Sequence, residues 1–236
     1  QFRQLTLITN ASFLHEHDES LQYLDRVIVS LDSTDAEDWQ TIVGVTSSTV
    51  QTVYENLQRY AARQQALDFQ MAVNCVLTAE TLSHARKILE FCKLNRIAIS
   101  FSPQAVQNWP HYDLLVAEAY TEFIQELILL KRRGEPILGS MAYLKTLLFL
   151  QPYSCYPTLA PRVMPNGDLV YPCRPIERQG GAHGGRPVNL LDVDSWNAAV
   201  QIAFAQYGQP PRVCSSCFQQ CYAEPSLMQA QPLIHL

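Results

Sequence analysis

The stretch "RVIVSLD", Arg26–Asp32, is a short apolar run, rich in Val and Ile, that ends on polar residues. Three further runs of this kind stand in the first part of the chain: "LTLITN" (Leu5–Asn10), "FQMAVNCVL" (Phe69–Leu77) and "IAISFS" (Ile97–Ser102). Strands that are apolar almost throughout are typical of parallel sheets whose faces are covered by helices. We therefore expect four parallel strands at these positions.

Helical patterns separate the runs. After the first quoted run, Thr34 and Glu37 have the spacing of a capping box. Farther along, apolar residues recur at helical spacing, namely Val50, Val53, Leu57, Tyr60 and Ala61. Thr78 can cap a later helix that extends to about Leu94. Strands that alternate with amphipathic helices predict right-handed parallel βα units, either in an open sheet or in a barrel.

Polar residues follow the apolar part of every run: Thr9, Asn10, Ser30, Asp32, Asn74, Thr78, Ser100, Ser102 and Gln104. In parallel sheets, ligands bind at the carboxyl ends of the strands. Any one of these residues could equally cap a helix or start a turn, but a row of them at one edge favours a polar small-molecule site. The sequence contains neither GxGxxG nor a P-loop, which argues against a nucleotide held on a glycine-rich turn.

A helical section joins this part to the rest of the chain, from about Trp109 to Leu150. One helix is expected from near Asp113 to Arg133, because Gly134 is a normal stop signal. The stretch "SMAYLKTLLFL" predicts a shorter second helix.

The last third of the chain holds five of the seven cysteines: Cys155, Cys173, Cys214, Cys217 and Cys221. The stretch "RVMPNGDLVYPC" predicts a β-hairpin that turns at Asn166–Gly167 and ends at Cys173. The hairpin and the CxxC turn "CSSC" offer four thiolates, which suit either zinc or an iron–sulfur cluster, and a disulfide pair is a third possibility. Cys75 and Cys92 fall on apolar faces and are expected in the core.

The composition argues against several partners. A formal net charge of −5 gives no electrostatic basis for binding nucleic acid or an anionic membrane. No apolar run reaches the roughly 18 residues that a membrane-spanning helix needs. The first residues, "QFRQLTLITNAS", lack the pattern of a signal peptide, so we expect a cytoplasmic protein.

Taken together, these motifs resemble those of the radical S-adenosylmethionine enzymes that carry a SPASM or twitch auxiliary-cluster domain. "LITNAS" is similar to the third strand of their barrel, and "VIVSLDSTD" is similar to the fourth. "CYPTLAPRVMPNGDLVYPC" is similar to the auxiliary hairpin, and "CSSCFQQCY" is similar to its closing motif. The resemblance covers essentially the whole chain.

The resemblance implies an α/β fold. A partial (β/α) barrel with about strands three to six (residues 1–108) precedes a helical connector (109–150) and a small cysteine-rich auxiliary domain (151–236). It implies that four residues surround S-adenosylmethionine: Asn10, Ser30, Asp32 and Asn74. It also implies that an auxiliary 4Fe–4S cluster is ligated by Cys155, Cys173, Cys214 and Cys217. Cys221 is then a fifth thiol, which could be the true fourth ligand, a donor to a second centre or a free thiol in the core.

The resemblance also implies a reaction and its partners. Enzymes of this kind abstract hydrogen with a 5′-deoxyadenosyl radical, here from an unknown peptide or small molecule, and take electrons from a flavodoxin or ferredoxin.

The sequence departs from the family pattern in places. The CxxxCxxC loop of the radical-generating cluster is not in the sequence. We expect that loop upstream of Gln1, and expect this polypeptide alone to be inactive. Val43 stands where the family often has an arginine. The alternative is a βα protein with a structural zinc site and no radical chemistry.

Overall fold

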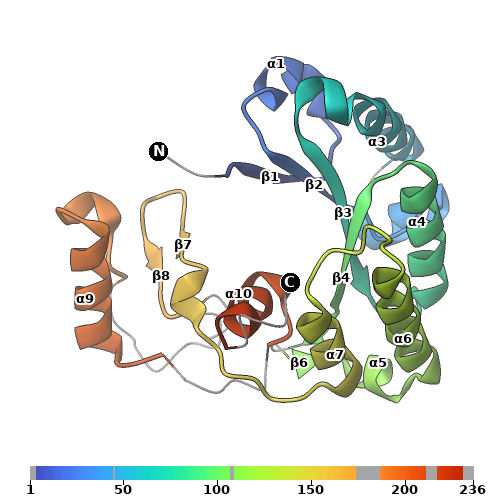
Figure 1. Cartoon of the computed structure of the whole chain (residues 1–236). Coiled ribbons are helices and arrows are strands. Elements are labelled where there is room, and N and C mark those ends of the chain that lie inside the picture. Colours follow the sequence, from blue (N-terminus) through green and yellow to red (C-terminus); the bar gives the residue numbers. More distant parts are fainter. Residues whose placement is uncertain (1–3, 45, 107–108, 174–186, 211–216, 231–236) are drawn as a thin grey trace. The chain divides into compact units, whose positions relative to one another are not determined.

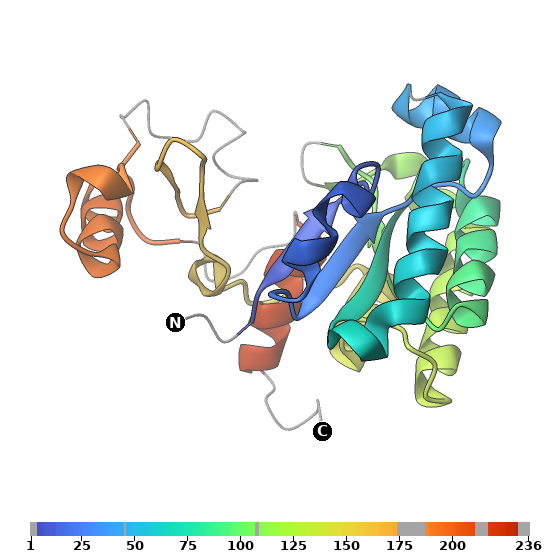
Figure 2. The same ribbon diagram turned by 90° about the horizontal axis from the view of Figure 1, so that it is seen from above.

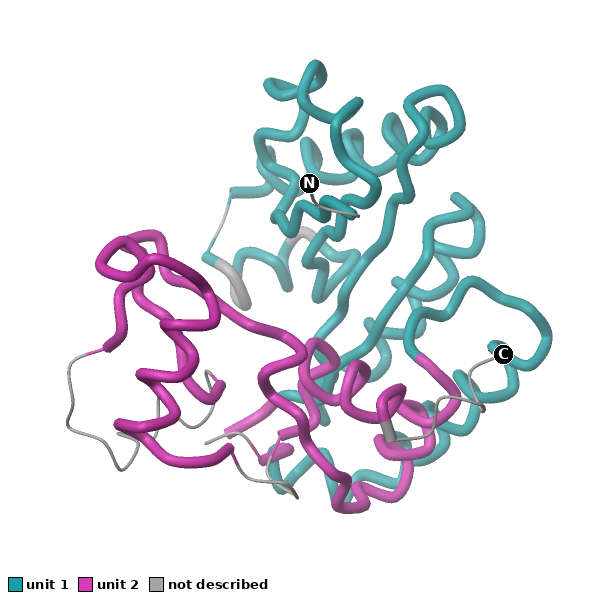
Figure 3. The backbone as a smooth tube through the Cα atoms, turned by 60° about the vertical axis from the view of Figure 1, so that its left-hand side comes forward, with its two compact units in different colours: residues 1–104, 111–139 teal, residues 105–110, 140–236 magenta. Residues whose placement is uncertain are grey.

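The computed structural model describes residues 4–44, 46–106, 109–173, 187–210 and 217–230. It divides into two compact units (Figure 3). Unit 1 comprises residues 1–104 and 111–139, and unit 2 comprises residues 105–110 and 140–236. The boundaries expected near residues 108 and 150 for a barrel and a connector stay predictions. No helix in the described ranges is both long and apolar enough to cross a membrane.

Unit 1 is built on a parallel four-stranded sheet in the order β1-β2-β3-β4 (Figure 1). Its strands are β1 (Thr6–Thr9), β2 (Arg26–Ser30), β3 (Gln70–Leu77) and β4 (Ala98–Pro103). All four coincide with the apolar runs of the sequence, so the expected strands and their parallel pairing are confirmed. Each strand pairs with the next one in sequence, as adjacent βα units require.

Helices follow each strand of unit 1: η1 (Leu14–His17), α1 (Asp18–Leu21), α2 (Ala36–Val43), α3 (Ser47–Leu67), α4 (Leu82–Leu94), α5 (Tyr112–Val116) and α6 (Glu118–Arg132). Figures 1 and 2 show α3, α4 and α6 side by side along one face of the sheet. The residues of β2 and β3 that point to this face, such as Val27, Val29, Met71 and Val73, are fully buried. The core of unit 1 therefore lies between the sheet and these helices.

Two helix starts differ from the sequence expectation. The N-cap of α2 is Asp35, not Thr34, and its carboxylate accepts a hydrogen bond from the Glu37 amide over 2.8 Å. The α4 helix begins after Thr81, and Thr78 instead accepts a hydrogen bond from the Thr81 amide over 3.0 Å. In both places two candidate cap residues stand close together, and the backbone path decides between them.

The helix expected from Asp113 to Arg133 is divided into α5 and α6. Ala117 lies between them with φ −77° and ψ 111°, which is an extended conformation that interrupts the helical hydrogen bonds. The shorter helix expected from "SMAYLKTLLFL" is confirmed as α7 (Met141–Phe149), which belongs to unit 2.

Unit 2 contains short elements: β5 (Ala105–Val106), β6 (Trp109–Pro110), η2 (Pro157–Leu159), β7 (Arg162–Val163), β8 (Leu169–Val170), η3 (Leu190–Asp192), α9 (Trp196–Tyr207) and α10 (Gln220–Ala230). The antiparallel pair β7–β8 confirms the expected hairpin. Gly167 in its turn has φ +89°, and a Cβ there would lie 2.7 Å from the Asn189 Oδ1 atom. The turn therefore requires glycine.

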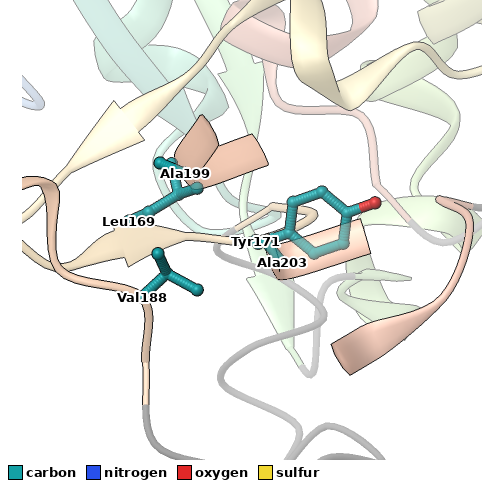
Figure 4. Close-up of a cluster of buried hydrophobic side chains, with 5 residues drawn as sticks. All are labelled: Leu169, Tyr171, Val188, Ala199 and Ala203. Carbon is teal, nitrogen blue, oxygen red and sulfur yellow. The ribbon is translucent and has the colours of Figure 1, made fainter. Parts of the chain in front are cut away.

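One hydrophobic cluster of unit 2 joins the hairpin to α9 (Figure 4). It consists of Leu169, Tyr171, Val188, Ala199 and Ala203. The Tyr171 hydroxyl also donates to the Gly208 carbonyl over 2.9 Å. These contacts fix the strand that leads into Cys173.

Candidate ligand edge and thiol cluster

Three polar residues stand in register across the sheet of unit 1. Ser30 of β2 pairs with Asn74 of β3, and Asn74 pairs with Ser100 of β4. Side chains alternate along a strand, so these three face away from the helices that cover Val29 and Val73. A row of polar groups therefore crosses the sheet at the last residue of β2 and part-way along β3 and β4.

Asn10 continues this row on the first strand. It directly follows Thr9, which pairs with Val29, so it stands beside Ser30 at the end of β1. Its Oδ1 atom accepts a hydrogen bond from the Ser12 amide over 3.1 Å. Adjacent strands are about 4.8 Å apart, so the row from Asn10 to Ser100 spans roughly 14 Å, which suits a small ligand.

The Asn74 side chain is oriented by its neighbour. The Ser100 hydroxyl, only 3% exposed, donates to Asn74 Oδ1 over 2.9 Å. Asn74 itself is half-buried, whereas Ser30 is exposed. With its oxygen engaged, Asn74 can offer its amide nitrogen to a ligand as a hydrogen-bond donor.

Asp32 lies just beyond the end of β2 and is half-buried. Its Oδ1 atom accepts a hydrogen bond from the Val76 amide over 2.8 Å. Burial raises the pKa of the Asp32 carboxyl, and the hydrogen bond from Val76 acts in the opposite direction. The structure thus brings all four predicted cofactor residues to one sheet edge, which we call the ligand edge: Asn10, Ser30, Asp32 and Asn74.

Two of the predicted metal ligands share a buried cluster in unit 2. Cys173 follows the β8 strand, Cys217 precedes α10, and both pack with Tyr222. Cys217 is only 4% exposed. The Tyr153 hydroxyl donates to the Cys217 carbonyl over 2.7 Å, which holds the backbone before α10 in place.

Cys155 is also buried and lies against the same helix. The Ser226 hydroxyl of α10 lies 4.0 Å from Cys155 Sγ as a hydrogen-bond donor, and it accepts a hydrogen bond from the Tyr156 amide over 2.8 Å. Residues 222 and 226 are four apart and therefore share a face of the helix. Cys173 and Cys217 thus pack with Tyr222, and Cys155 lies against Ser226, one helical turn farther along the same face of α10.

The remaining predicted ligands are placed differently. Cys221 is exposed on α10, and Cys214 lies outside the described residues. Among the residues that the structure does describe, no three His, Cys, Asp or Glu side chains lie close enough together to hold a metal ion. The described thiols supply the chemistry that iron–sulfur clusters and zinc prefer, since thiolates are soft ligands, but they do not form a complete ligand set.

No family model matches the chain, and the search of curated proteins gave no match. Solved structures do match it. The crystal structure of Streptococcus suis SuiB bound to S-adenosylmethionine matches over 86% of this chain, with a TM-score of 0.58 and 18% sequence identity. The fold of this chain is similar to that of SuiB.

Two further structures of SuiB from Streptococcus suis agree with this result. SuiB bound to the precursor peptide SuiA covers 82% of this chain, with a TM-score of 0.56 and 16% identity. A third SuiB structure covers 88% of it, with a TM-score of 0.57 and 16% identity. The matches cover 49%, 47% and 49% of the SuiB chains, so this chain spans about half of their length. At these sequence identities the similarity to SuiB concerns the fold alone.

Two residues that support these sites were not predicted from the sequence. Asn56 is a polar residue on the buried face of α3, and Ser226 is a fully buried polar residue of α10. A polar residue at a core position signals a buried hydrogen bond. That signal was present at Asn56, which is spaced three residues from Val53 on the apolar stripe.

Proposed function

We propose that the protein is a radical S-adenosylmethionine enzyme that acts on a peptide. The observation that carries the proposal is the row of Asn10, Ser30, Asn74 and Ser100, which crosses a parallel sheet at the carboxyl ends of β1 and β2. Ligands of parallel αβ folds bind at this edge. The similarity in fold to SuiB, solved with S-adenosylmethionine bound, supports this ligand.

The ligand edge offers complementary hydrogen-bonding groups. Asn10 and Asn74 each use their side-chain oxygen inside the protein, so each can donate through its amide nitrogen to an acceptor such as the carboxylate of S-adenosylmethionine. The second carboxylate oxygen of Asp32 can accept from an amino or hydroxyl group of the ligand. The Ser30 hydroxyl can either donate or accept a hydrogen bond. These residues would bind and orient the cofactor without taking part in bond cleavage.

We further propose that residues 151–236 form an auxiliary domain whose cysteines hold a 4Fe–4S cluster, after a barrel part (1–108) and a connector (109–150). Cys155, Cys173, Cys214 and Cys217 would be the ligands, with Cys221 as the alternative fourth ligand. When bound, such a cluster supplies electron-transfer chemistry. The protein's own contribution is to bury Cys155, Cys173 and Cys217 and to donate a hydrogen bond to Cys155 from Ser226.

The substrate class proposed is a peptide. The support is that SuiB has been solved with its precursor peptide SuiA bound and is similar in fold to 82% of this chain. The proposed electron donor is a flavodoxin or a ferredoxin, as the resemblance implies.

Purification of the full-length protein without oxygen tests this function. The expected result is a coloured protein with iron and acid-labile sulfide in equal amounts, which forms 5′-deoxyadenosine from S-adenosylmethionine when it is reduced. A colourless protein that holds zinc, lacks sulfide and forms no 5′-deoxyadenosine would contradict the proposal and support the structural zinc alternative.

A further inference from the structure

Asn56 is a buried polar residue on the core-facing side of α3. Its side chain is 4% exposed, and it lies among Val53, Leu57 and Tyr60, which are fully buried. Burying an amide is unfavourable unless the group is hydrogen-bonded. The Asn56 Nδ2 atom donates to the Ala11 carbonyl over 2.8 Å, across 45 residues of sequence, and it also lies 3.3 Å from His15 Nδ1.

The turn that accepts this hydrogen bond has an unfavourable backbone conformation. Ala11 has φ +62° and is fully buried. A residue with a Cβ atom seldom adopts this left-handed region, so the surrounding structure has to hold it there. Ala11 is also the residue that directly follows Asn10 of the ligand edge.

Three other hydrogen bonds shape the turn, and all are local. The Thr9 hydroxyl accepts from the Ala11 amide over 3.0 Å, and Asn10 Oδ1 accepts from the Ser12 amide over 3.1 Å. The Leu14 amide also donates to the Ala11 carbonyl, over 3.3 Å. The bond from Asn56 differs because it ties the turn to α3, a 21-residue helix that packs on the sheet. Asn56 therefore links the turn that carries Asn10 to a long helix.

We propose that Asn56 is a positioning residue for the ligand edge. By holding the Ala11 carbonyl, it keeps the turn closed, so that Asn10 directs its oxygen to Ser12 and its amide nitrogen outward. Asn56 acts through the turn and does not itself touch a ligand. The identity of the ligand as S-adenosylmethionine rests on the proposed function.

A matched control lies one turn farther along the same helix face. Tyr60 is fully buried, and its hydroxyl bonds to the Asp18 carboxylate, which also receives hydrogen bonds from Arg59 and Arg63. The Tyr60 hydroxyl also donates to the Leu14 carbonyl over 3.5 Å. Tyr60→Phe thus removes hydrogen bonds between α3 and the segment after β1, but it leaves the bond from Asn56 to the Ala11 carbonyl in place. Comparing this variant with the Asn56 variants separates a general loss of stability from a loss of the Asn10 orientation.

The experiment compares Asn56→Leu and the milder Asn56→Ala with Tyr60→Phe in the full-length protein. Backbone hydrogen exchange of the segment around Ala11 and Ser12 is measured without ligand, and S-adenosylmethionine affinity is measured by calorimetry. Both Asn56 variants are expected to exchange faster in this segment and to bind roughly tenfold more weakly, the equivalent of one hydrogen bond. Tyr60→Phe, at a similar loss of melting temperature, should keep the wild-type affinity.

Unchanged exchange in both Asn56 variants would overturn the proposal, as would an equal loss of affinity in Tyr60→Phe. If the wild-type protein binds no S-adenosylmethionine, the proposed function fails. The exchange comparison still decides the positioning role in that case, because faster exchange confined to the Asn56 variants upholds it.

Discussion

The Asp32 carboxylate accepts a hydrogen bond from the backbone amide of Val76 over 2.8 Å. The β2 strand ends at Ser30, whereas β3 continues to Leu77. The Asp32 side chain therefore provides the acceptor that a longer β2 would have provided with a backbone carbonyl. Asp32 has a structural role at the ligand edge in addition to the cofactor role proposed for it.

Because of this structural role, Asp32→Ala and Asp32→Asn should differ in their effect on stability. Asp32→Ala leaves the Val76 amide without its acceptor and should lower the free energy of unfolding by about 1–3 kcal/mol. Asp32→Asn keeps an oxygen in place and should avoid this loss. Urea unfolding followed by circular dichroism measures both, and equal losses in the two variants would show that the hydrogen bond to Val76 contributes nothing.

The stability difference between Asp32→Asn and the wild type should depend on pH. Burial raises the pKa of Asp32 above its ordinary value of 3.8, so ionisation of this carboxyl costs more in the folded protein than in the unfolded chain. The wild type therefore loses stability relative to Asp32→Asn as the pH rises from the unfolded pKa through the folded pKa, and the difference is constant above both. Unfolding free energies at a series of pH values give this curve. A difference that stays flat or changes in the opposite direction would contradict the raised pKa.

Ser226 should matter for the stability of unit 2. It is fully buried, and Ser226→Ala removes the acceptor of the Tyr156 amide together with the donor to Cys155. We expect a loss of about 1–3 kcal/mol in the free energy of unfolding. Gln229→Ala, an exposed change on the same helix, is the control and should have little effect. A Ser226→Ala protein as stable as this control would rule out the structural role.

The proposed cluster ligands can be separated by iron content. Cys155→Ala, Cys173→Ala and Cys217→Ala should each lose the iron of one cluster, because all three thiols are buried against α10 or in the Cys173–Cys217–Tyr222 cluster. Cys221→Ala should lose less, since Cys221 is exposed, and Cys92→Ala in the core of unit 1 serves as the control. Iron loss in Cys221→Ala together with iron retention in Cys217→Ala would show that the fourth ligand is misassigned.

The strands were predictable because their signal is local. Each apolar run in unit 1 became a parallel strand, and the turn at Asn166–Gly167 became the hairpin turn. The helix starts were less predictable, because Thr34 and Asp35 are adjacent and either residue type can cap a helix. Only the backbone conformation selects Asp35.

The hydrogen-bond partners of the supporting residues could not be found from the sequence for a different reason. Asn56 bonds to a residue 45 positions away, and Ser226 lies against a thiol 71 positions away. No local pattern encodes such partners, since they meet only when the fold brings their elements together. The row of Asn10, Ser30 and Asn74 was foreseeable, because parallel strands place their carboxyl ends at one edge.

The proposal that the ligand edge binds S-adenosylmethionine is tested by calorimetry with three forms of the full-length protein. Asn74→Ala changes the ligand edge, whereas Gln70→Ala changes the opposite end of the same strand. We predict that the wild type and Gln70→Ala bind S-adenosylmethionine equally well and that Asn74→Ala binds it roughly tenfold more weakly, as expected for one lost hydrogen bond. Equal binding by Asn74→Ala and Gln70→Ala, or no binding by the wild type, would contradict the claim.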